Sequence, residues 1–234
     1  ITIDGPAAVG KTTVGKGLAN RLGYVCFDTG VMYRALTYAV INSPIDYDDE
    51  ARVSQLAWDL SIDILPPSRM DGRLNDIMIG GKDCTWEIRH PSVNQLVSEI
   101  SAYPEVRKAL TEQQRRIAEK GKMVVLGRDI GSIVLPDAPC KIFLTASAEV
   151  RAKRRFEEER SQERTISYED VLSSIKHRDQ IDGSRKAAPM VIPEDALVID
   201  TDDLEISQVI DMILQHCNCE NNEKKRKGHG VLSD

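Results

Sequence analysis

Short apolar runs alternate with longer amphipathic stretches along most of the chain. Five runs rich in Val, Ile, Leu or Phe are each followed directly by Gly, Asp or Thr, at residues 1–3, 24–27, 123–126, 141–144 and 196–199. Buried parallel strands have this composition, and right-handed helical crossovers join them. The pattern predicts an α/β fold with a doubly wound, five-stranded parallel sheet, helices on both faces and ligands at the carboxyl ends of the strands.

Two segments depart from this alternation. Residues about 58–95 hold strand-like pieces at 60–65 and 74–79, separated by Pro-Pro, Asp-Gly and Gly-Gly pairs, with no helical period. This pattern predicts a small β-rich insert. Residues about 155–168 are densely charged, which is typical of a solvated helix face or a flexible loop. We expect one domain over residues 1–216 that contains both segments.

The end of the chain has a different composition. Residues 217–234 are rich in Asn, Glu and Lys and include a basic run at 224–227. A segment with so few apolar side chains cannot form a packed core of its own. We therefore expect this tail to be disordered.

Charge and hydropathy narrow the classes of partner. The 234 residues carry a net charge of -6, with 41% hydrophobic and 29% charged residues, which is ordinary for a globular protein. The negative charge argues against broad binding of nucleic acid. No apolar run approaches the ~20 residues of a membrane span. We expect a monomer that binds neither nucleic acid nor membrane.

The cysteines indicate whether the protein belongs in a reducing or an oxidising cellular compartment. The five cysteines, at positions 26, 84, 140, 217 and 219, show no spacing typical of a zinc site. Cys26 and Cys140 lie in apolar, strand-like runs, where cysteine usually serves as a small buried hydrophobic side chain. We therefore expect a reducing, cytoplasmic location.

The most specific motif lies at the start of the chain. Residues 5–12 match the phosphate-binding loop pattern G-x-x-x-x-G-K-[ST] between a predicted strand and a predicted helix. Backbone N–H groups and the positive helix end would bind phosphate, with Lys11 at the β- and γ-phosphates and the Thr12 hydroxyl on Mg²⁺. The residues expected to bind ATP here are Gly5, Pro6, Ala7, Ala8, Val9, Gly10, Lys11, Thr12 and Thr13.

Three further runs place arginines at strand ends or loops. They are residues 28–34 (Asp-Thr-Gly-Val-Met-Tyr-Arg), residues 127–129 (Gly-Arg-Asp) and residues 178–185, which begin and end with arginine. Each run alone is a weak signal, because an arginine at a strand end is often a plain surface charge. Together with the loop they gather more positive charge around one site than a core or surface role explains.

These runs, with the Ser98…Tyr103-Pro104-x-Val106-Arg107 stretch, occur together and in this order in bacterial-type cytidylate kinases, and the chain resembles that family from residue 1 to about 216. The resemblance implies a P-loop NTPase fold. It also implies that the insert at about 58–95 binds CMP and that a lid at about 151–168 covers ATP. The implied reaction transfers a phosphoryl group from ATP, with Mg²⁺, to CMP or dCMP.

The resemblance also implies roles for single residues. Lys11, Arg128 and Arg178 would act in catalysis, and at least one of Arg151, Arg154 and Arg155 in the lid would contact the triphosphate. The residues expected to bind CMP are Arg34, Arg128 and Thr29 at its phosphate, Arg178 and Asp182 at its sugar, and Ser98, Arg107, Asp129 and Arg185 at its base.

The implied chemistry agrees with the residue types. A nucleoside monophosphate is already largely ionised near neutral pH, since its second pKa is ~6, so no general base is needed. Catalysis then reduces to positioning the substrates and neutralising their charge, which arginines can do. The absence of a catalytic base agrees with the four histidines, which show no pairing pattern. Asp129 and Ser98 can accept from the amino group of cytosine while an arginine donates to its N3 and O2.

Two alternatives remain open at this stage. Another small-molecule kinase of the same fold, such as a UMP/CMP, shikimate or gluconate kinase, would share the loop. A nucleotide switch would need a guanine-reading Asn-Lys-x-Asp run, and the chain has none. Two acidic residues at strand ends have ordinary explanations, since Asp4 suits a structural role and Asp200 suits a cap before the helix at 204–214.

Overall fold

The computed structural model of the protein describes residues 1–161, 166–184 and 190–228. Its main sheet is five-stranded, in the order β2-β6-β1-β7-β8, and every neighbouring pair is parallel. All five strands predicted from the apolar runs are confirmed, within a residue or two at each end. Their bounds are Thr2–Asp4 (β1), Val25–Asp28 (β2), Met123–Gly127 (β6), Lys141–Thr145 (β7) and Leu197–Asp200 (β8).

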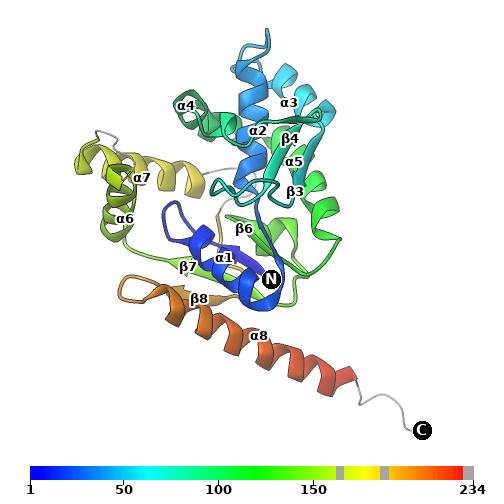
Figure 1. Ribbon diagram of the computed structural model, residues 1–234, viewed down its shortest axis with the longest axis vertical. Coiled ribbons are helices and arrows are strands. Elements are labelled where there is room, and N and C mark those ends of the chain that lie inside the picture. The colour runs from blue at the N-terminus through cyan, green and yellow to red at the C-terminus, as the bar shows by residue number, and fades with distance from the viewer. Residues whose placement is uncertain (162–165, 185–189, 229–234) are drawn as a thin grey trace.

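Helices cover both faces of this sheet because its strands are apolar on both faces. On β6, Val124 and Leu126 point into one buried cluster and Val125 points into another. The first cluster packs against α1 (Lys11–Leu22) and α8 (Ile206–Gly228), and the second against α2 (Gly30–Ile41) and α5 (Pro104–Ala118). Figure 1 shows the sheet between these two layers. The doubly wound architecture is confirmed.

The predicted insert contains a three-stranded antiparallel sheet, β3-β4-β5, with strands Ile62–Leu65, Asp76–Ile79 and Lys82–Asp83. It follows α3 (Glu50–Asp59) and is followed by a 3₁₀ turn, η1 (Glu87–Arg89), and by α4 (Pro91–Ile100). The expected range of 58–95 therefore ends inside a helix, which Pro91 can begin because the first helical position needs no N–H donor.

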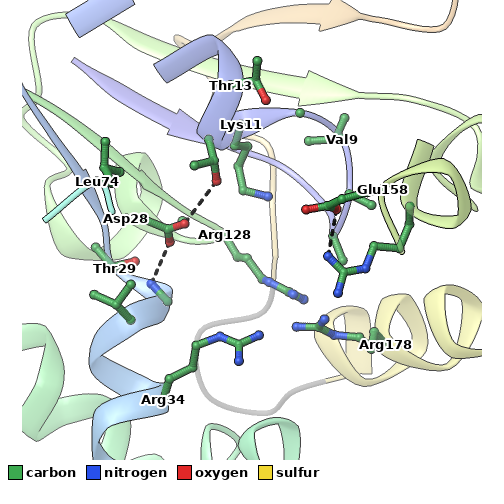
Figure 2. A pocket seen from close by; sticks show the side chains of 18 of the residues that line it. Val9, Lys11, Thr13, Asp28, Thr29, Arg34, Leu74, Arg128, Glu158 and Arg178 are labelled. Carbon is green, nitrogen blue, oxygen red and sulfur yellow. Dashed lines mark hydrogen bonds and ion pairs between the residues drawn. The ribbon is translucent and has the colours of Figure 1, made fainter. Parts of the chain in front are cut away.

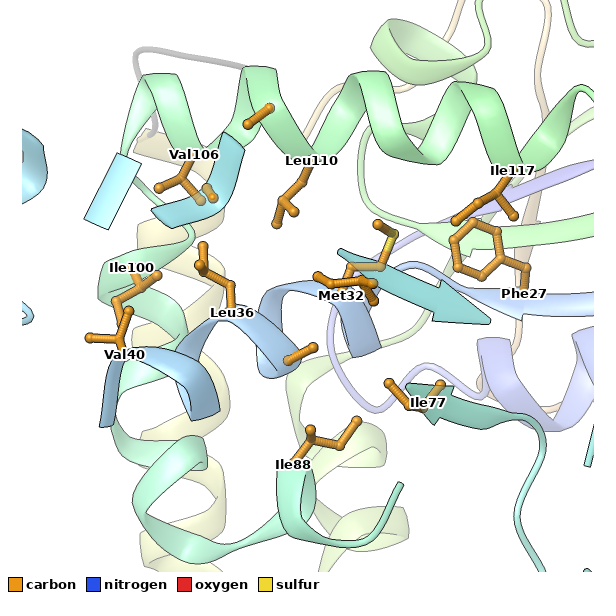
Figure 3. Close-up of a cluster of buried hydrophobic side chains, with 14 of the residues drawn as sticks. Phe27, Met32, Leu36, Val40, Ile77, Ile88, Ile100, Val106, Leu110 and Ile117 are labelled. Atoms are coloured by element: carbon orange, nitrogen blue, oxygen red, sulfur yellow. The ribbon is translucent and has the colours of Figure 1, made fainter. Parts of the chain in front are cut away.

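A buried arginine holds this small sheet together. The Arg73 guanidinium donates to carboxylates of Asp71, Asp76 and Asp83 at 2.7 to 2.9 Å. Ile77, on the inner face of β4, joins the main core beside Met32 and Leu110 (Figure 3). Charge pairing thus fixes the outer part of the insert, where there are too few apolar side chains for a separate core.

The charged segment at about 151–168, predicted as a lid, lies mainly on α6 (Ala148–Ser161) and ends at the first residue of α7 (Tyr168–Ser184). Ser147 caps α6, because its Oγ accepts from the Val150 N–H at 3.3 Å. The helices pack through a small apolar cluster that contains Ala152, Val171 and Ile175. Residues 162–165, within the expected lid, lie outside the described residues.

The C-terminal part differs from the expectation at one cysteine. Helix α8 extends to Gly228, residues 229–234 lie outside the described residues, and the expected disorder of the tail stays a prediction. Cys140 is buried as expected but forms a disulfide with Cys217 of α8, so its interpretation as a simple hydrophobic side chain is wrong. Cys26 and Cys84 are buried free thiols. Among the described residues, no helix is long and apolar enough to cross a membrane.

Asp4, at the end of β1, has the structural role predicted for it. Its carboxylate is buried and accepts from the N–H groups of Ile130 and Gly131 at 2.8 and 2.7 Å. These residues begin a short π-type turn, η2 (Ile130–Val134), directly after Asp129. Burial raises the pKa of Asp4 to about 6. Asp4 therefore anchors the segment that carries Arg128 and Asp129.

Replacing Asp4 with Ala leaves two buried N–H groups without their acceptor. We expect the D4A variant to lose about 2 kcal/mol of unfolding free energy at pH 7, as measured by urea denaturation. The control is Asp63→Ala, an exposed carboxylate on β3, which should change the free energy by less than about 0.5 kcal/mol. Equal effects of the two changes would show that Asp4 does not anchor the turn.

Candidate active site

One large pocket, with a volume of about 1460 Å³, lies at the carboxyl ends of the strands. Its lining comes from the phosphate-binding loop, the β2–α2 turn, the insert, α4, the turn after β6, α6, α7 and residues 201–209. The predicted site residues that line it are Ala7, Ala8, Val9, Gly10, Lys11, Thr12, Thr13, Thr29, Arg34, Ser98, Arg107, Arg128, Asp129, Arg154, Arg155 and Arg178. The topology thus brings together motifs that are far apart in the sequence.

The phosphate-binding loop needs glycine at its two fixed positions. Gly5 has φ 147°, and a Cβ there would lie 2.2 Å from the carbonyl oxygen of Leu144 on β7. Gly10 has φ 97° and begins α1. Because these glycines let the backbone turn tightly, the loop can present its N–H groups to an anion.

Lys11 is held close to the loop. Its Nζ donates to the carbonyl oxygens of Gly5 and Pro6, both at 2.7 Å. Burial, and then the positive charge of Arg128, lower the pKa of Lys11 to about 7. An anion placed beside Lys11 would reverse this effect and restore its charge.

Three arginines face Lys11 across the pocket. Figure 2 shows the side chains of Arg34, Arg128 and Arg178 extending from three different elements toward one region. Arg34 donates to the Asn94 Oδ1 at 2.6 Å, and Arg128 forms an ion pair with the buried Asp182. Burial, and then Arg178, lower the pKa of Arg34 to about 10. Such a concentration of half-buried positive charge favours a polyanion.

A second polar group lies deeper, next to α4 and α5. Arg107 and Asp129 are both buried and form an ion pair. The Arg107 Nη1 also donates to the Ser101 carbonyl oxygen at 3.1 Å, and its Cζ lies 5.4 Å from the centre of the Tyr33 ring. These contacts fix a donor and an acceptor side by side in the pocket wall. Ser98, which was predicted to bind the base with them, lines the same pocket.

Sequence reasoning missed one polar residue at the loop. The Asp28 Oδ2 accepts from the Thr12 Oγ at 3.2 Å, and its Oδ1 accepts from the Gly30 N–H at 3.0 Å. The available signal was its position directly after β2 in the 28–34 motif. Because Thr12 donates its proton to Asp28, the hydroxyl keeps a lone pair for a cation. Carboxylate and hydroxyl oxygens are suitable ligands for Mg²⁺.

Two other polar residues at strand ends are engaged in local structure. Asp200 is exposed, and its Oδ1 accepts from the Asp202 N–H at 3.0 Å in a local turn. It does not cap the following helix as predicted, because α8 begins at Ile206. The Thr29 hydroxyl lines the pocket but donates to the Leu126 carbonyl oxygen at 2.8 Å. Thr29 therefore also ties the β2–α2 turn to β6.

The three lid arginines have different environments. Arg154 donates to the Thr201 Oγ at 3.0 Å, and Arg155 pairs with Glu158 at 2.9 Å; both line the pocket. Arg151 is buried, paired with Asp179, and outside the pocket lining. Arg185 lies outside the described residues.

The sequence interpretation also missed one wall of the pocket. The segment after β8 lines it through Thr201, Asp202, Asp203, Leu204, Glu205, Ile206 and Val209. The signal was its position, because this segment follows a strand at the carboxyl edge of the sheet. Its mixture of apolar side chains and backbone polar groups suits a flat heterocyclic ring.

Comparison with known proteins identifies close relatives. The family model described as cytidylate kinase matches residues 1–219. The chain is 44% identical to a cytidylate kinase of Roseiflexus castenholzii, covering 97% of each chain, and 46% identical to one of Caldanaerobacter subterraneus subsp. tengcongensis, covering 92% of each. A crystal structure of shikimate kinase from Bacteroides thetaiotaomicron aligns over 92% of this chain and 96% of its own, with TM-score 0.50 and 16% identity. This last likeness supports the fold alone.

The lowered pKa of Lys11 predicts proton uptake when an ATP analogue binds. With a pKa of about 7, most Lys11 side chains are neutral at pH 7.5, and bound phosphates would protonate them. Titration calorimetry in buffers of different ionisation enthalpy should give roughly 0.7 proton more uptake in the wild type than in Lys11→Arg at pH 7.5. At pH 6 Lys11 is already protonated, so the difference should fall to roughly 0.1 proton. The same difference at both pH values would contradict the shift.

Proposed function

The chain belongs to the cytidylate kinase family, and from this premise we propose that it transfers the γ-phosphoryl group of ATP to CMP or dCMP, giving ADP and CDP or dCDP. It is a phosphotransferase whose acceptor is itself a phosphate group. One observation carries the assignment of residues, namely the convergence of Lys11, Arg34, Arg128 and Arg178 (Figure 2) in a pocket that the phosphate-binding loop and the Arg107–Asp129 pair also line. This set of groups suits a donor triphosphate, a transferring phosphoryl group and an acceptor nucleotide.

The donor phosphates would lie on the loop and the N-terminus of α1. Loop N–H groups and the positive helix end would bind the phosphate oxygens. Lys11 would exchange its bonds to the carbonyl groups of Gly5 and Pro6 for bonds to the β- and γ-phosphates. The adenine ring would lie against residues 201–209, beside Arg154.

The acceptor phosphate would lie between Arg34 and Arg128, with Arg178 close to both phosphate groups. Two like charges 4 Å apart repel by about 4 kcal/mol at an effective dielectric constant of 20. Fixed cations that lie between the two polyanions offset this repulsion, most strongly in the in-line transition state. The ionised oxygen of the acceptor phosphate attacks the γ-phosphorus of ATP directly. These residues therefore position the two substrates and neutralise their charge, and no residue has to remove a proton.

Thr12 and Asp28 together would hold Mg²⁺ with ATP. The two oxygens already lie within hydrogen-bonding distance, at 3.2 Å, and both belong to types that Mg²⁺ prefers. When bound, the cation neutralises charge on the β- and γ-phosphate oxygens. Asp28 would also keep the Thr12 hydroxyl oriented, because it accepts the hydroxyl proton.

Cytosine would be recognised at the Arg107–Asp129 pair, beside Ser98. Asp129 can accept from the 4-amino group, and Arg107 can donate to N3 and O2. Uracil would place a carbonyl oxygen against the carboxylate and leave buried groups unpaired, a difference of roughly 2 to 4 kcal/mol. Arg178 would contact the sugar. Asp182 is buried, paired with Arg128 and outside the pocket lining, so its contact with the sugar stays a prediction, as does the contact of Arg185 with the base.

We propose that the protein acts as a monomer, because the loop, the cations and the Arg107–Asp129 pair all belong to one chain. We propose a cytoplasmic location because the reaction needs ATP and a nucleoside monophosphate. The Cys140–Cys217 disulfide removes the argument from cysteine usage. Shikimate or gluconate kinase activity is not favoured, since the relatives at 44% and 46% identity are cytidylate kinases. A buried donor–acceptor pair also suits a nucleobase better than a sugar.

A coupled assay of ADP release tests the proposed reaction. With ATP and Mg²⁺, we expect rapid turnover of CMP and dCMP and turnover at least about 10-fold lower with UMP, AMP, GMP or shikimate. Preference for another acceptor would leave the fold intact and contradict the assignment of the base site. Lack of turnover with every acceptor would contradict the proposed function.

The base site is tested by Asp129→Asn, which keeps the shape of the side chain and adds an N–H donor. We expect the ratio of kcat/KM for CMP to that for UMP to fall at least about 10-fold. The control is Arg34→Lys, which weakens a phosphate contact common to both substrates and should lower both values while leaving their ratio nearly unchanged. An unchanged ratio in the Asn variant would place base recognition elsewhere.

A further inference from the structure

Arg151 joins three parts of the site without lining the pocket. Its Nη1 and Nη2 donate to the two carboxylate oxygens of Asp179 on α7, at 3.0 and 2.6 Å. The same Nη1 donates to the carbonyl oxygen of Ala7 in the phosphate-binding loop, at 3.2 Å, and Nε donates to that of Ala146 after β7, at 3.0 Å. One guanidinium thus bridges the loop, the sheet and a lid helix.

The environment of Arg151 is that of a structural bridge rather than of a mobile phosphate ligand. The residue is 5% exposed, and a buried arginine is stable only when its charge is paired and its N–H groups are bonded. To reach a nucleotide it would have to leave both Asp179 and the Ala7 carbonyl. Arg154 and Arg155, one turn farther along α6, already line the pocket.

The contact with Ala7 lies at a backbone position that needs support. The next residue, Ala8, has φ 60°, a left-handed conformation that residues with a Cβ rarely adopt. The Ala8 side chain packs against the apolar cluster between α6 and α7, which contains Ala152, Val171 and Ile175. The lid helices therefore hold this peptide from both sides, through a hydrogen bond at Ala7 and through packing at Ala8.

The other end of the bridge is next to a cation of the site. Asp179 directly follows Arg178, which extends into the pocket (Figure 2). The same helix carries Asp182, the ion-pair partner of Arg128. The position of α7 relative to the loop therefore decides how Arg178 and Arg128 lie relative to the donor phosphates.

We propose that Arg151 is a positioning residue that ties the phosphate-binding loop to α7, so that the loop and Arg178 reach the transferring phosphoryl group together. It acts through the Ala7 carbonyl and Asp179 and does not contact the nucleotide. The kinetic part of this proposal rests on the proposed function. The structural part, that Arg151 and Asp179 jointly shape the ATP site, is independent of the acceptor.

The experiment compares Arg151→Lys, Asp179→Asn and the double variant with Lys153→Ala, an exposed cation on the same helix. The readouts are the Kd of a non-hydrolysable ATP analogue, kcat and KM for ATP and CMP, and the Tm. We expect each single variant to raise the Kd about 10-fold and to lower kcat about 10-fold. Neither change keeps the bidentate guanidinium–carboxylate pair between Arg151 and Asp179. KM for CMP should change less than 3-fold, and Lys153→Ala should match the wild type.

Asp179→Asn separates positioning from direct contact. If Arg151 bound phosphate directly, removal of the Asp179 charge would free it, and ATP affinity would stay the same or increase. The Lys variant would then retain much of the affinity, since lysine binds phosphate well as a point charge. The positioning role instead requires that both variants weaken binding to a similar extent and that the double variant is little worse than either one.

A fall in Tm with the Kd and kcat of the folded fraction unchanged would overturn the proposal and leave a purely structural ion pair. Normal Kd and kcat in both stable single variants would overturn it as well. If the wild type does not phosphorylate CMP, the proposed function fails, but the Kd values still test the bridge. Arg151→Ala, compared at a temperature well below its Tm, provides a second variant in case the lysine change prevents folding.

Discussion

Mutual repulsion among the cations of the pocket is the constraint on which the rest of the structure depends. Lys11 and Arg34 both have a lowered pKa because burial and neighbouring positive charges disfavour their charged forms. Such groups stay together only if rigid elements hold them, and here they come from α1, α2, the end of β6 and α7. The sheet supplies the scaffold. The buried carboxylate of Asp4 anchors the turn that carries Arg128, and the buried carboxylate of Asp182 pairs with Arg128 itself.

The apolar runs were sufficient to predict the five parallel strands and the helices on both faces, because buried strands leave a contiguous hydrophobic pattern. The phosphate-binding loop at 5–12 was equally predictable, because its glycines set the backbone conformation of the loop and Lys11 contacts the loop itself. The roles of Arg151 and Arg73 could not be predicted in the same way. Their partners depend on how helices and turns pack in space, and an arginine that binds a carboxylate looks the same in sequence as one that binds phosphate.

Asp28 illustrates an intermediate case. Its position after β2 marked it as a polar residue at the functional edge of the sheet, but the sequence did not indicate that it lies beside the Thr12 hydroxyl.

The disulfide between Cys140 and Cys217, which are 77 positions apart in the sequence, closes the chain between them into a covalent ring. Helices α6 and α7, strand β8 and most of α8 belong to this ring, whereas the phosphate-binding loop and the insert lie outside it. A single backbone cut within the ring would therefore leave the polypeptide as one covalent molecule until the disulfide is reduced. After reduction, apolar side chains such as Ile213 would still pack the last helix on the sheet, and Asp211 would still pair with Arg21 of α1.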